Sequence, residues 1–393
     1  MAINIQNIVN ALRAKINAAD SDLSVVELGR LAQANRVIGD LQNAVRFRNS
    51  RYPDPDRFNQ GRIIWDSDDG EFRISQNYKW TAIDLVDSDA VYQGPPIQGS
   101  IAGFTIGGAP PAGNNDIQRY PFATDEPATD VGSMPTSVYT VSGSYNDTYG
   151  FVTGNFTDNT SILYLQMANT VTVTGDAGDL TASRQYAAGH SDKNASISYV
   201  SGGQQDTLET IDRFPQATTT TATSIGNLSR KFDYHAGNSD VGGGNGYAWE
   251  GYISQGNPVL TNDGNKWPFA ASVTTTVLTG GLGVYGASGI STSTDGYITG
   301  GQLRDPPRAY QPQIRRFPFA SDVITTPGFY TYFPGGARYA VTSASQTHGY
   351  LTGGIATVPT TAMHKFPFNN DANSASIGTL AVASEFQGAG VHQ

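Results

Sequence analysis

The chain has 393 residues, contains no cysteine and carries a formal net charge of −10 at pH 7. The lack of cysteine excludes disulfide scaffolds, thiolate metal sites and cysteine nucleophiles. The acidity argues against the lysine- and arginine-rich surface that nucleic acid binding requires. With 45 glycines and only 15% charged residues, against roughly 25% in an average soluble protein, the composition is typical of an all-β protein with many tight turns.

Residues 1–50 predict a helical hairpin. Ile5, Ile8, Leu12 and Ile16 fall on one helical stripe, and a capping box begins at Ser24 ahead of a second amphipathic segment. Such a short segment buries too little apolar surface to fold alone. We therefore expect an anchor that docks onto a partner or a second copy of the chain; packing on the rest of the chain is the alternative. We expect no signal peptide and no membrane insertion, because no long apolar segment occurs.

Residues 51–97 predict a small adaptor and a linker. Ile63–Trp65 and Phe72–Ile74 are predicted to form a β-hairpin that turns at Asp69-Gly70, with Trp80 following. A Gly-Pro-Pro linker then leads to residue 98, where the composition changes to a repeat.

Residues 98–393 contain three phrases that each return about six times, with a period near 49 residues. The first is an aromatic residue followed by proline and, in most copies, phenylalanine and alanine; it is led by Tyr120, Phe214, Trp267, Phe317 and Phe366, and a degenerate copy without the proline is led by Tyr164. The second is a strand that ends in paired glycines; its copies begin at Gly103, Gly150, Ser198, Gly251, Gly296 and Gly349. The third follows the first, contains a leucine, as at Leu180, Leu228 and Leu380, and leads to Ala-Gly.

This repeat predicts a mainly β fold, a six-bladed β-propeller. Each unit supplies three or four short strands that cannot bury both faces alone, so copies must pack against one another. The last third phrase lacks a paired-glycine strand after it, and the first such strand lacks a third phrase before it, so we expect the C-terminal segment to pair with the first blade. The proline predicts an edge strand or a bulge. The repeat aromatics are expected in the blade cores.

The double glycine followed by an aromatic strand resembles kelch-type propellers. The combination of Gly-Tyr-x-Thr-Gly-Gly, Ile-x-Arg/Lys-Phe-Pro-Phe-Ala and Asp-x-Gly-x-Leu-Thr resembles the repeat of structural virion proteins of tailed phages, particularly those of marine cyanobacteria. The hairpin of residues 63–74 similarly resembles adaptor hairpins near the N-termini of phage fibre proteins. Residues 156–172 and 232–256 depart from the repeat and leave the blade boundaries there open. The resemblance supplies no catalytic residues.

The sequence offers few candidates for chemistry. No phosphate-binding loop, HExxH pair or nucleophile elbow is present, and we expect no cofactor, no metal and no catalytic residue. Paired carboxylates contributed by different blades remain possible. Trp249, beside a glycine run, and Tyr330, Tyr332 and Phe333, in a long connection, are candidate binding residues because aromatic rings outside the phrases are free to stack on carbohydrate or protein; local packing is the alternative.

The resemblance and the anchor-plus-repeat organisation together imply a non-enzymatic virion protein, assembled in the host cytoplasm. It would be a tail, neck or head fibre or appendage that contacts other virion proteins through residues 1–97 and displays the propeller to a host polysaccharide or protein. A homo-oligomer is expected. The alternatives are a capsid or tube decoration protein and a propeller enzyme that degrades glycans. Convergent carboxylates in the central channel would favour the enzyme, and a polar, uncharged channel would favour display.

Overall fold

The structure, a computed structural model, describes residues 63–66, 71–76, 79–83, 97–108, 114–155, 160–204, 208–253, 259–304, 308–325, 336–358, 360–369, 372–384 and 389–393. The chain divides into two compact units, residues 1–91 and 92–393. Strands, turns and isolated bridges make up these ranges, and none of the described segments is a helix that could cross a membrane. The predicted helices of residues 1–50 lie outside the described residues.

The described part of the first unit is a three-stranded antiparallel sheet. Its strands are β1 (Ile63–Asp66), β2 (Glu71–Gln76) and β3 (Lys79–Ile83). Ile63 pairs with Ile74 and Trp65 with Phe72, which confirms the predicted hairpin pairing. The expected turn at Asp69-Gly70 lies outside the described residues.

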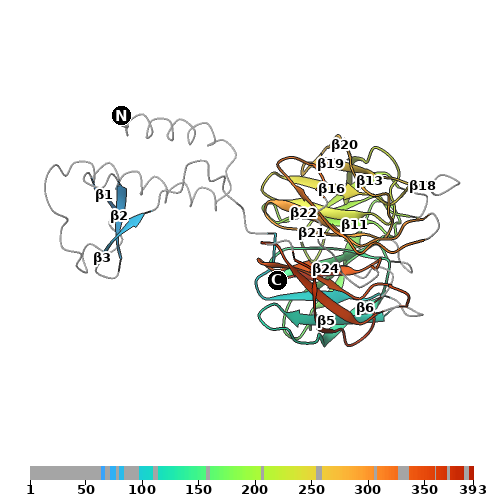
Figure 1. Ribbon diagram of the computed structural model, residues 1–393, viewed down its shortest axis with the longest axis horizontal. Helices are drawn as coiled ribbons and strands as arrows, with labels where there is room; N and C mark the ends of the chain where they lie inside the picture. Colours follow the sequence, from blue (N-terminus) through green and yellow to red (C-terminus); the bar gives the residue numbers. More distant parts are fainter. Residues whose placement is uncertain are drawn as a thin grey trace. The chain divides into compact units, whose positions relative to one another are not determined.

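The second unit is built from six small antiparallel sheets, the blades (Figure 1). Blade 1 contains β28 (Ala389–His392), β4 (Ala102–Ile106), β5 (Asn114–Pro121) and β6 (Thr129–Val138). Blade 2 contains β7 (Ser142–Tyr145), β8 (Tyr149–Thr153), β9 (Ser161–Gln166) and β10 (Thr174–Asp179). Blade 3 contains β11 (Ala188–Asp192), β12 (Ile197–Ser201), β13 (Thr210–Pro215) and β14 (Thr223–Asn227).

The remaining blades follow the same plan. Blade 4 contains β15 (Ala236–Asp240), β16 (Asn245–Trp249), β19 (Asp263–Pro268) and β20 (Thr276–Thr279), with an inserted hairpin of β17 (Tyr252–Ile253) and β18 (Val259–Leu260). Blade 5 contains β21 (Ser288–Ser291), β22 (Asp295–Thr299) and β23 (Ile314–Pro318). Blade 6 contains β24 (Val341–Ala344), β25 (His348–Thr352), β26 (Ala362–Pro367) and β27 (Ala375–Thr379). In blade 5 a single bridge between Arg316 and Thr325 takes the place of the fourth strand.

The first strand of each sheet faces the centre, and these six inner strands contact one another in a closed circle: β7, β11, β15, β21, β24, β28 and back to β7. The chain closes this circle by pairing β28 with β4, with Ala389 opposite Ile106 and Val391 opposite Phe104. The red C-terminal strand and the teal first strands of Figure 1 therefore belong to one blade. This confirms the expected six-bladed propeller and its closure through the C-terminal segment.

The repeat aromatics form the blade cores, as expected. Phe317 pairs with Gly296 and Phe366 with Gly349, and a Cβ on either glycine would fall 2.2–2.5 Å from the opposing ring. The glycine thus makes room for the ring across the sheet. In blade 2 the residue opposite Gly150 is Leu165, which is fully buried, whereas Tyr164 is partly exposed. The sequence alignment of Tyr164 with the other lead aromatics was therefore wrong by one residue.

The departure from the repeat in residues 232–256 comes from the inserted hairpin of β17 and β18. The second strand of blade 4 is Asn245–Trp249, whereas the expected copy beginning at Gly251 falls on β17. The expectation for the proline was also wrong. Pro215 and Pro367 are the last residues of central strands, and the bulges lie earlier, between Ile211 and Asp212 and between Met363 and His364.

Candidate functional site

The inner strands line a channel with a cavity of only about 110 Å³. Ligand pockets usually measure about 300–1,000 Å³. The described lining residues are serines, alanines, glycines and aliphatic residues, together with Thr342, Tyr145, His235 and His392; none of them is aspartate, glutamate, lysine or arginine. The channel is therefore polar, uncharged and too narrow for a sugar ring.

A ring of small residues constricts the channel at mid-height. Gly143, Gly189, Gly237, Gly289 and Gly390 occupy equivalent positions on five inner strands. A Cβ on Gly289 would fall 1.9 Å from the carbonyl oxygen of Gly237, and one on Gly390 would fall 2.0 Å from that of Thr342. Thr342 occupies the sixth position, where its hydroxyl donates a 2.7 Å hydrogen bond to the carbonyl oxygen of Gly289. Glycine is required here because adjacent backbones touch.

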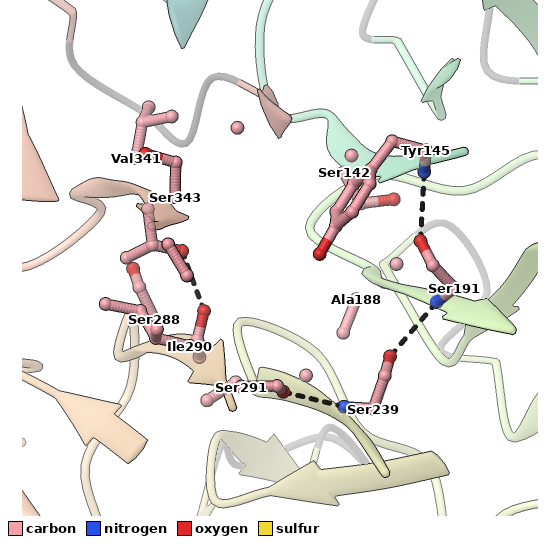
Figure 2. Close-up of a pocket in the computed structure, with 18 of the residues that line it drawn as sticks. Ser142, Tyr145, Ala188, Ser191, Ser239, Ser288, Ile290, Ser291, Val341 and Ser343 are labelled. Carbon is pink, nitrogen blue, oxygen red and sulfur yellow. Dashed lines mark hydrogen bonds between the residues drawn. The ribbon is translucent and has the colours of Figure 1, made fainter. Parts of the chain in front are cut away.

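Two residues further along the inner strands, serine side chains join neighbouring blades (Figure 2). The amide of Tyr145 donates to Oγ of Ser191, the amide of Ser191 to Oγ of Ser239, and the amide of Ser239 to Oγ of Ser291, at 2.9–3.0 Å. These bonds satisfy inner-strand amides that no fifth strand reaches. These serine hydroxyls therefore have a structural role, because each accepts a hydrogen bond from the inner strand of the neighbouring blade.

One end of the channel is closed by Ile97, where the chain enters the propeller. Its carbonyl oxygen accepts hydrogen bonds from the Tyr145 hydroxyl at 3.0 Å and from Nε2 of His392 at 2.7 Å. Nδ1 of His392 accepts the amide of Ala344 at 3.2 Å, so the ring is neutral with its proton on Nε2. Burial lowers the pKa of His392 to about 3.

Two further histidines form a buried chain between blades 3 and 4. Nδ1 of His190 donates to the carbonyl oxygen of Asn238 at 3.1 Å, and its Nε2 accepts from the Ser201 hydroxyl at 2.9 Å. The Ser201 oxygen in turn accepts from Nε2 of His235 at 3.0 Å. Burial lowers the pKa of His190 to about 4 and that of His235 to about 3. Both rings are therefore neutral in this network at ordinary pH.

The opposite end of the channel carries a cluster that we call the collar. It consists of Tyr186, Tyr234, Tyr252, Tyr285, Gln302, Arg338 and Tyr339. Tyr186 and Tyr234 stack at 3.8 Å between ring centroids, and Tyr186 lies 6.4 Å from Tyr339. Tyr186 precedes β11 and Tyr339 precedes β24, which are opposite one another in the circle of six. The tyrosine rings therefore cover the axis.

The backbone of the collar repeats from blade to blade. The amides of Tyr186, Tyr234, Gly286 and Tyr339 each donate to the carbonyl of the equivalent residue one blade earlier, at 2.7–3.0 Å. Residues 140, 186, 234, 286 and 339 all have φ between 53° and 68°, although only one of them is glycine. In four blades of the described structure a second bridge links the preceding residue to a residue after the second strand, as between Tyr285 and Gln302, which follows the paired glycines. The paired glycines thus position this end of the blade.

The sequence-predicted binding residues are placed as follows. Trp249 is fully buried in the core of blade 4, where it packs on Phe317 with 5.1 Å between ring centroids. This placement favours the packing alternative. Tyr330, Tyr332 and Phe333 lie outside the described residues. Sequence reasoning missed the collar, whose signal was a tyrosine two residues before Ala-Gly at Tyr186 and Tyr234, and three before Thr342 at Tyr339.

Three of the six buried carboxylates in the described part of the propeller are paired with arginines; the six are Asp192, Asp212, Asp233, Asp240, Glu250 and Asp295. Asp212 pairs with Arg184 at 3.0 Å, and Asp295 pairs with Arg316 at 2.8 Å. Glu250 pairs with Arg315, with 2.9 Å from Nη2 to Oε2. Each of these three carboxylates is neutralised by its own arginine, so they form no pair of acid and base.

Comparisons with known proteins support the fold alone. No protein-family model and no curated protein sequence matches this chain. Among solved structures 326 chains match. One of them, described as "Structure of YjhT", has 10% sequence identity and a TM-score of 0.52, and the match covers 64% of this chain and 87% of that one. Because many functions share one fold, this likeness assigns the chain to the β-propellers and to no activity.

Proposed function

We propose that this chain is a structural protein of a tailed-phage virion that displays its propeller for binding to the host surface and catalyses no reaction. The observation that carries the proposal is the contrast between the two parts of the axis. The channel is closed and uncharged, whereas the collar has four partly exposed side chains, those of Tyr186, Tyr234, Tyr252 and Arg338, above the buried Tyr285, Gln302 and Tyr339.

The channel argues against a glycan-degrading enzyme. Glycoside hydrolysis uses two carboxyl groups that flank the bond to be cleaved, at about 5–10 Å from one another. The described channel lining has no carboxylate, and Asp212, Glu250 and Asp295 are each held by an arginine. These residues support a protein that binds a glycan without cleaving it over one that hydrolyses it.

The place in a virion rests on the sequence. The repeat phrases resemble those of phage structural proteins, and residues 1–97 lie outside the repeat. We propose that residues 1–97 attach the chain to other virion proteins and to further copies of itself after synthesis in the host cytoplasm.

Binding to cells tests the display function. Fluorescently labelled full-length chain is mixed with a panel of cyanobacterial strains, and cell-bound fluorescence and released reducing sugar are both measured. Saturable binding to some strains without sugar release is expected. Sugar release that grows with time and protein concentration would overturn the proposal in favour of the enzyme, and the absence of binding to every strain would also overturn it.

The proposed assembly role is tested separately by mass photometry of the full-length chain and of a variant carrying Ile8→Asp and Leu12→Asp. The wild-type chain is expected to oligomerise and the variant to be monomeric, because the substitutions place charges on the predicted helical stripe. A wild-type monomer, or a variant that oligomerises equally, would contradict an assembly role for this stripe.

A further inference from the structure

Arg338 differs from the other arginines of the propeller whose partners were described above. Arg184, Arg315 and Arg316 each face a carboxylate. Within the described residues Arg338 forms no ion pair; its guanidinium lies over the rings of Tyr285 and Tyr339, with Cζ 5.1 and 4.8 Å from the ring centroids. A positive charge is thus held at the surface of a protein whose net charge is −10.

The guanidinium is also oriented. Nη1 donates to the Tyr285 hydroxyl and, at 2.7 Å, to Oε1 of Gln302, and the Tyr285 hydroxyl donates to the same Oε1 at 2.5 Å. Tyr285 and Gln302 are buried and fixed by a backbone bridge, so they hold Arg338 in one orientation. An arginine offers five N–H donors. Nη2 has no hydrogen-bond partner among the described residues and remains available for an anion.

Partly exposed tyrosine rings surround this cation. Tyr252 stacks on Tyr285 with 4.6 Å between centroids, and Tyr234 lies edge-on to both of them. Burial raises the pKa of Tyr252 to about 12, so its hydroxyl is neutral at ordinary pH and serves as donor or acceptor. A neutral phenol next to an apolar ring face is suited to a ligand that has both hydroxyl groups and C–H surfaces.

The collar is also strained in a way that packing alone does not require. Tyr186, Tyr234 and Tyr339 adopt the left-handed conformation, with φ of 53°, 55° and 61°, at ring positions where Gly286 meets the same geometry without a side chain. Non-glycine residues in this conformation cost about 1–3 kcal/mol each and concentrate at ligand sites. Three tyrosines stand at these positions although glycine would relieve the strain, as it does at Gly286.

We propose that the collar is a binding site for a saccharide that carries an anionic group. The tyrosine rings contact the C–H faces of the sugar, and Arg338 pairs with its carboxylate or sulfate. The closed channel below keeps the ligand on the surface, which suits one residue of a long surface polysaccharide. This inference rests on the proposed host-surface binding and specifies the chemistry that is bound.

Two other ligand classes are weighed against this one. Nucleic acid requires clustered lysine and arginine, whereas this chain has 24 basic against 34 acidic residues. Tyrosine and arginine are also enriched at protein interfaces, so a protein partner is the second class, and the absence of binding to any acidic oligosaccharide in the test below would favour it.

The test measures affinity of the full-length chain by isothermal titration calorimetry. The probes are short oligogalacturonate, the same oligomer with its carboxylates methyl-esterified, and a sulfated galactan oligosaccharide beside its desulfated form. We expect an acidic oligomer to bind at least about tenfold more tightly than its neutral counterpart, and the affinity to fall with salt. The carboxylate and sulfate arms distinguish the two anions. Equal affinity for both members of each pair, or no binding, would overturn the proposal.

The site is located with matched variants. Arg338→Gln is expected to lose at least about tenfold in affinity for the acidic oligomer and Arg338→Lys to lose less, because lysine keeps the charge without the fork. Lys365→Gln is the control, since it removes an equal charge from a surface pair with Asp125 outside the collar. Thermal unfolding of each variant confirms that it is folded. An unchanged affinity in Arg338→Gln would place the anion elsewhere and refute the collar site.

The same variants separate this inference from the proposed function. If the wild-type chain binds cells and Arg338→Gln binds them equally, display stands and the collar site fails. If the wild-type chain binds acidic oligomers but no cells, the collar site stands and host binding fails.

Discussion

The constricted middle of the channel and the collar at its end use the same six-fold backbone in opposite ways. In the middle, five of six positions are glycine, because a Cβ would collide with the neighbouring strand. In the collar, equivalent positions hold threonine, tyrosine or glycine, and the adjacent positions include Tyr285 and Arg338. Backbone contact leaves no choice of side chain in the middle, whereas a surface ring tolerates variety. Positions that hold the same residue in nearly every blade therefore serve the fold, whereas equivalent positions that hold different residues are candidates for a binding site.

The largest expected effect comes from a contact between blades. Arg315→Met leaves the carboxylate of Glu250 buried without its partner, and breaking a buried pair in this way costs about 3–5 kcal/mol. Urea unfolding should show this loss. The double variant with Glu250→Gln should recover much of it. A cost below about 1 kcal/mol for the single variant would indicate that solvent reaches this pair, because exposed pairs contribute that little.

The next effect compares two positions of the same ring. Gly289→Ala places a Cβ against the carbonyl of Gly237 and should lower the free energy of unfolding by about 1–3 kcal/mol or more. Thr342→Ala introduces the same residue where a side chain already fits and removes one hydrogen bond, at about 1 kcal/mol. Chemical denaturation of both variants checks the order. The reverse order would show that the ring is looser than its backbone contacts indicate.

The buried histidines predict a loss of stability in acid. Because His190 has a folded pKa of about 4 and an unfolded value near 6.5, protonation favours the unfolded chain as the pH falls below 6.5, down to about pH 4. Between pH 6.5 and 5 the loss of unfolding free energy amounts to about 1.5 kcal/mol per fully buried histidine. Unfolding free energies measured across this range should fall less steeply in His190→Gln. His348→Gln, at a partly exposed position, is the control; equal slopes in wild type and His190→Gln would contradict the neutral network.

The smallest effect separates strain from binding in the collar. Thr140 has φ of 63° and a buried hydroxyl without a described partner. Thr140→Gly should therefore raise the free energy of unfolding by up to about 1 kcal/mol, which thermal unfolding would show as a slightly higher melting temperature. Tyr186→Gly relieves similar strain but loses the stacking on Tyr234 and should be no more stable than wild type. If Tyr186→Gly is clearly stabilised, the tyrosine is retained for a reason other than folding, which would strengthen the case for a ligand.

The sequence was sufficient to predict the repeat, the blade number and the closure, because the glycine–aromatic pairing recurs in nearly every blade. In blade 2 the sequence analysis aligned Tyr164 with the core aromatics, although Leu165 holds that position. In blade 4 it missed Gly246, the glycine that faces Trp267, because the inserted hairpin supplied a closer match to the phrase at Gly251. For the same reason Trp249 seemed to lie outside the repeat although it belongs to a core strand. The sequence shows the tyrosines of the collar but not their meeting, because the collar residues come from four blades and come together only when the circle closes.

The pairing of β28 with β4 has a further consequence for how the protein is made. The edge of β4 that faces the axis remains without its partner until residues 389–392 have left the ribosome, almost 300 positions later. During synthesis this strand edge is a template for pairing with another nascent chain. Completion of the circle therefore waits for β28, and crowding of several nascent chains on one message should favour exchange of this strand between neighbours.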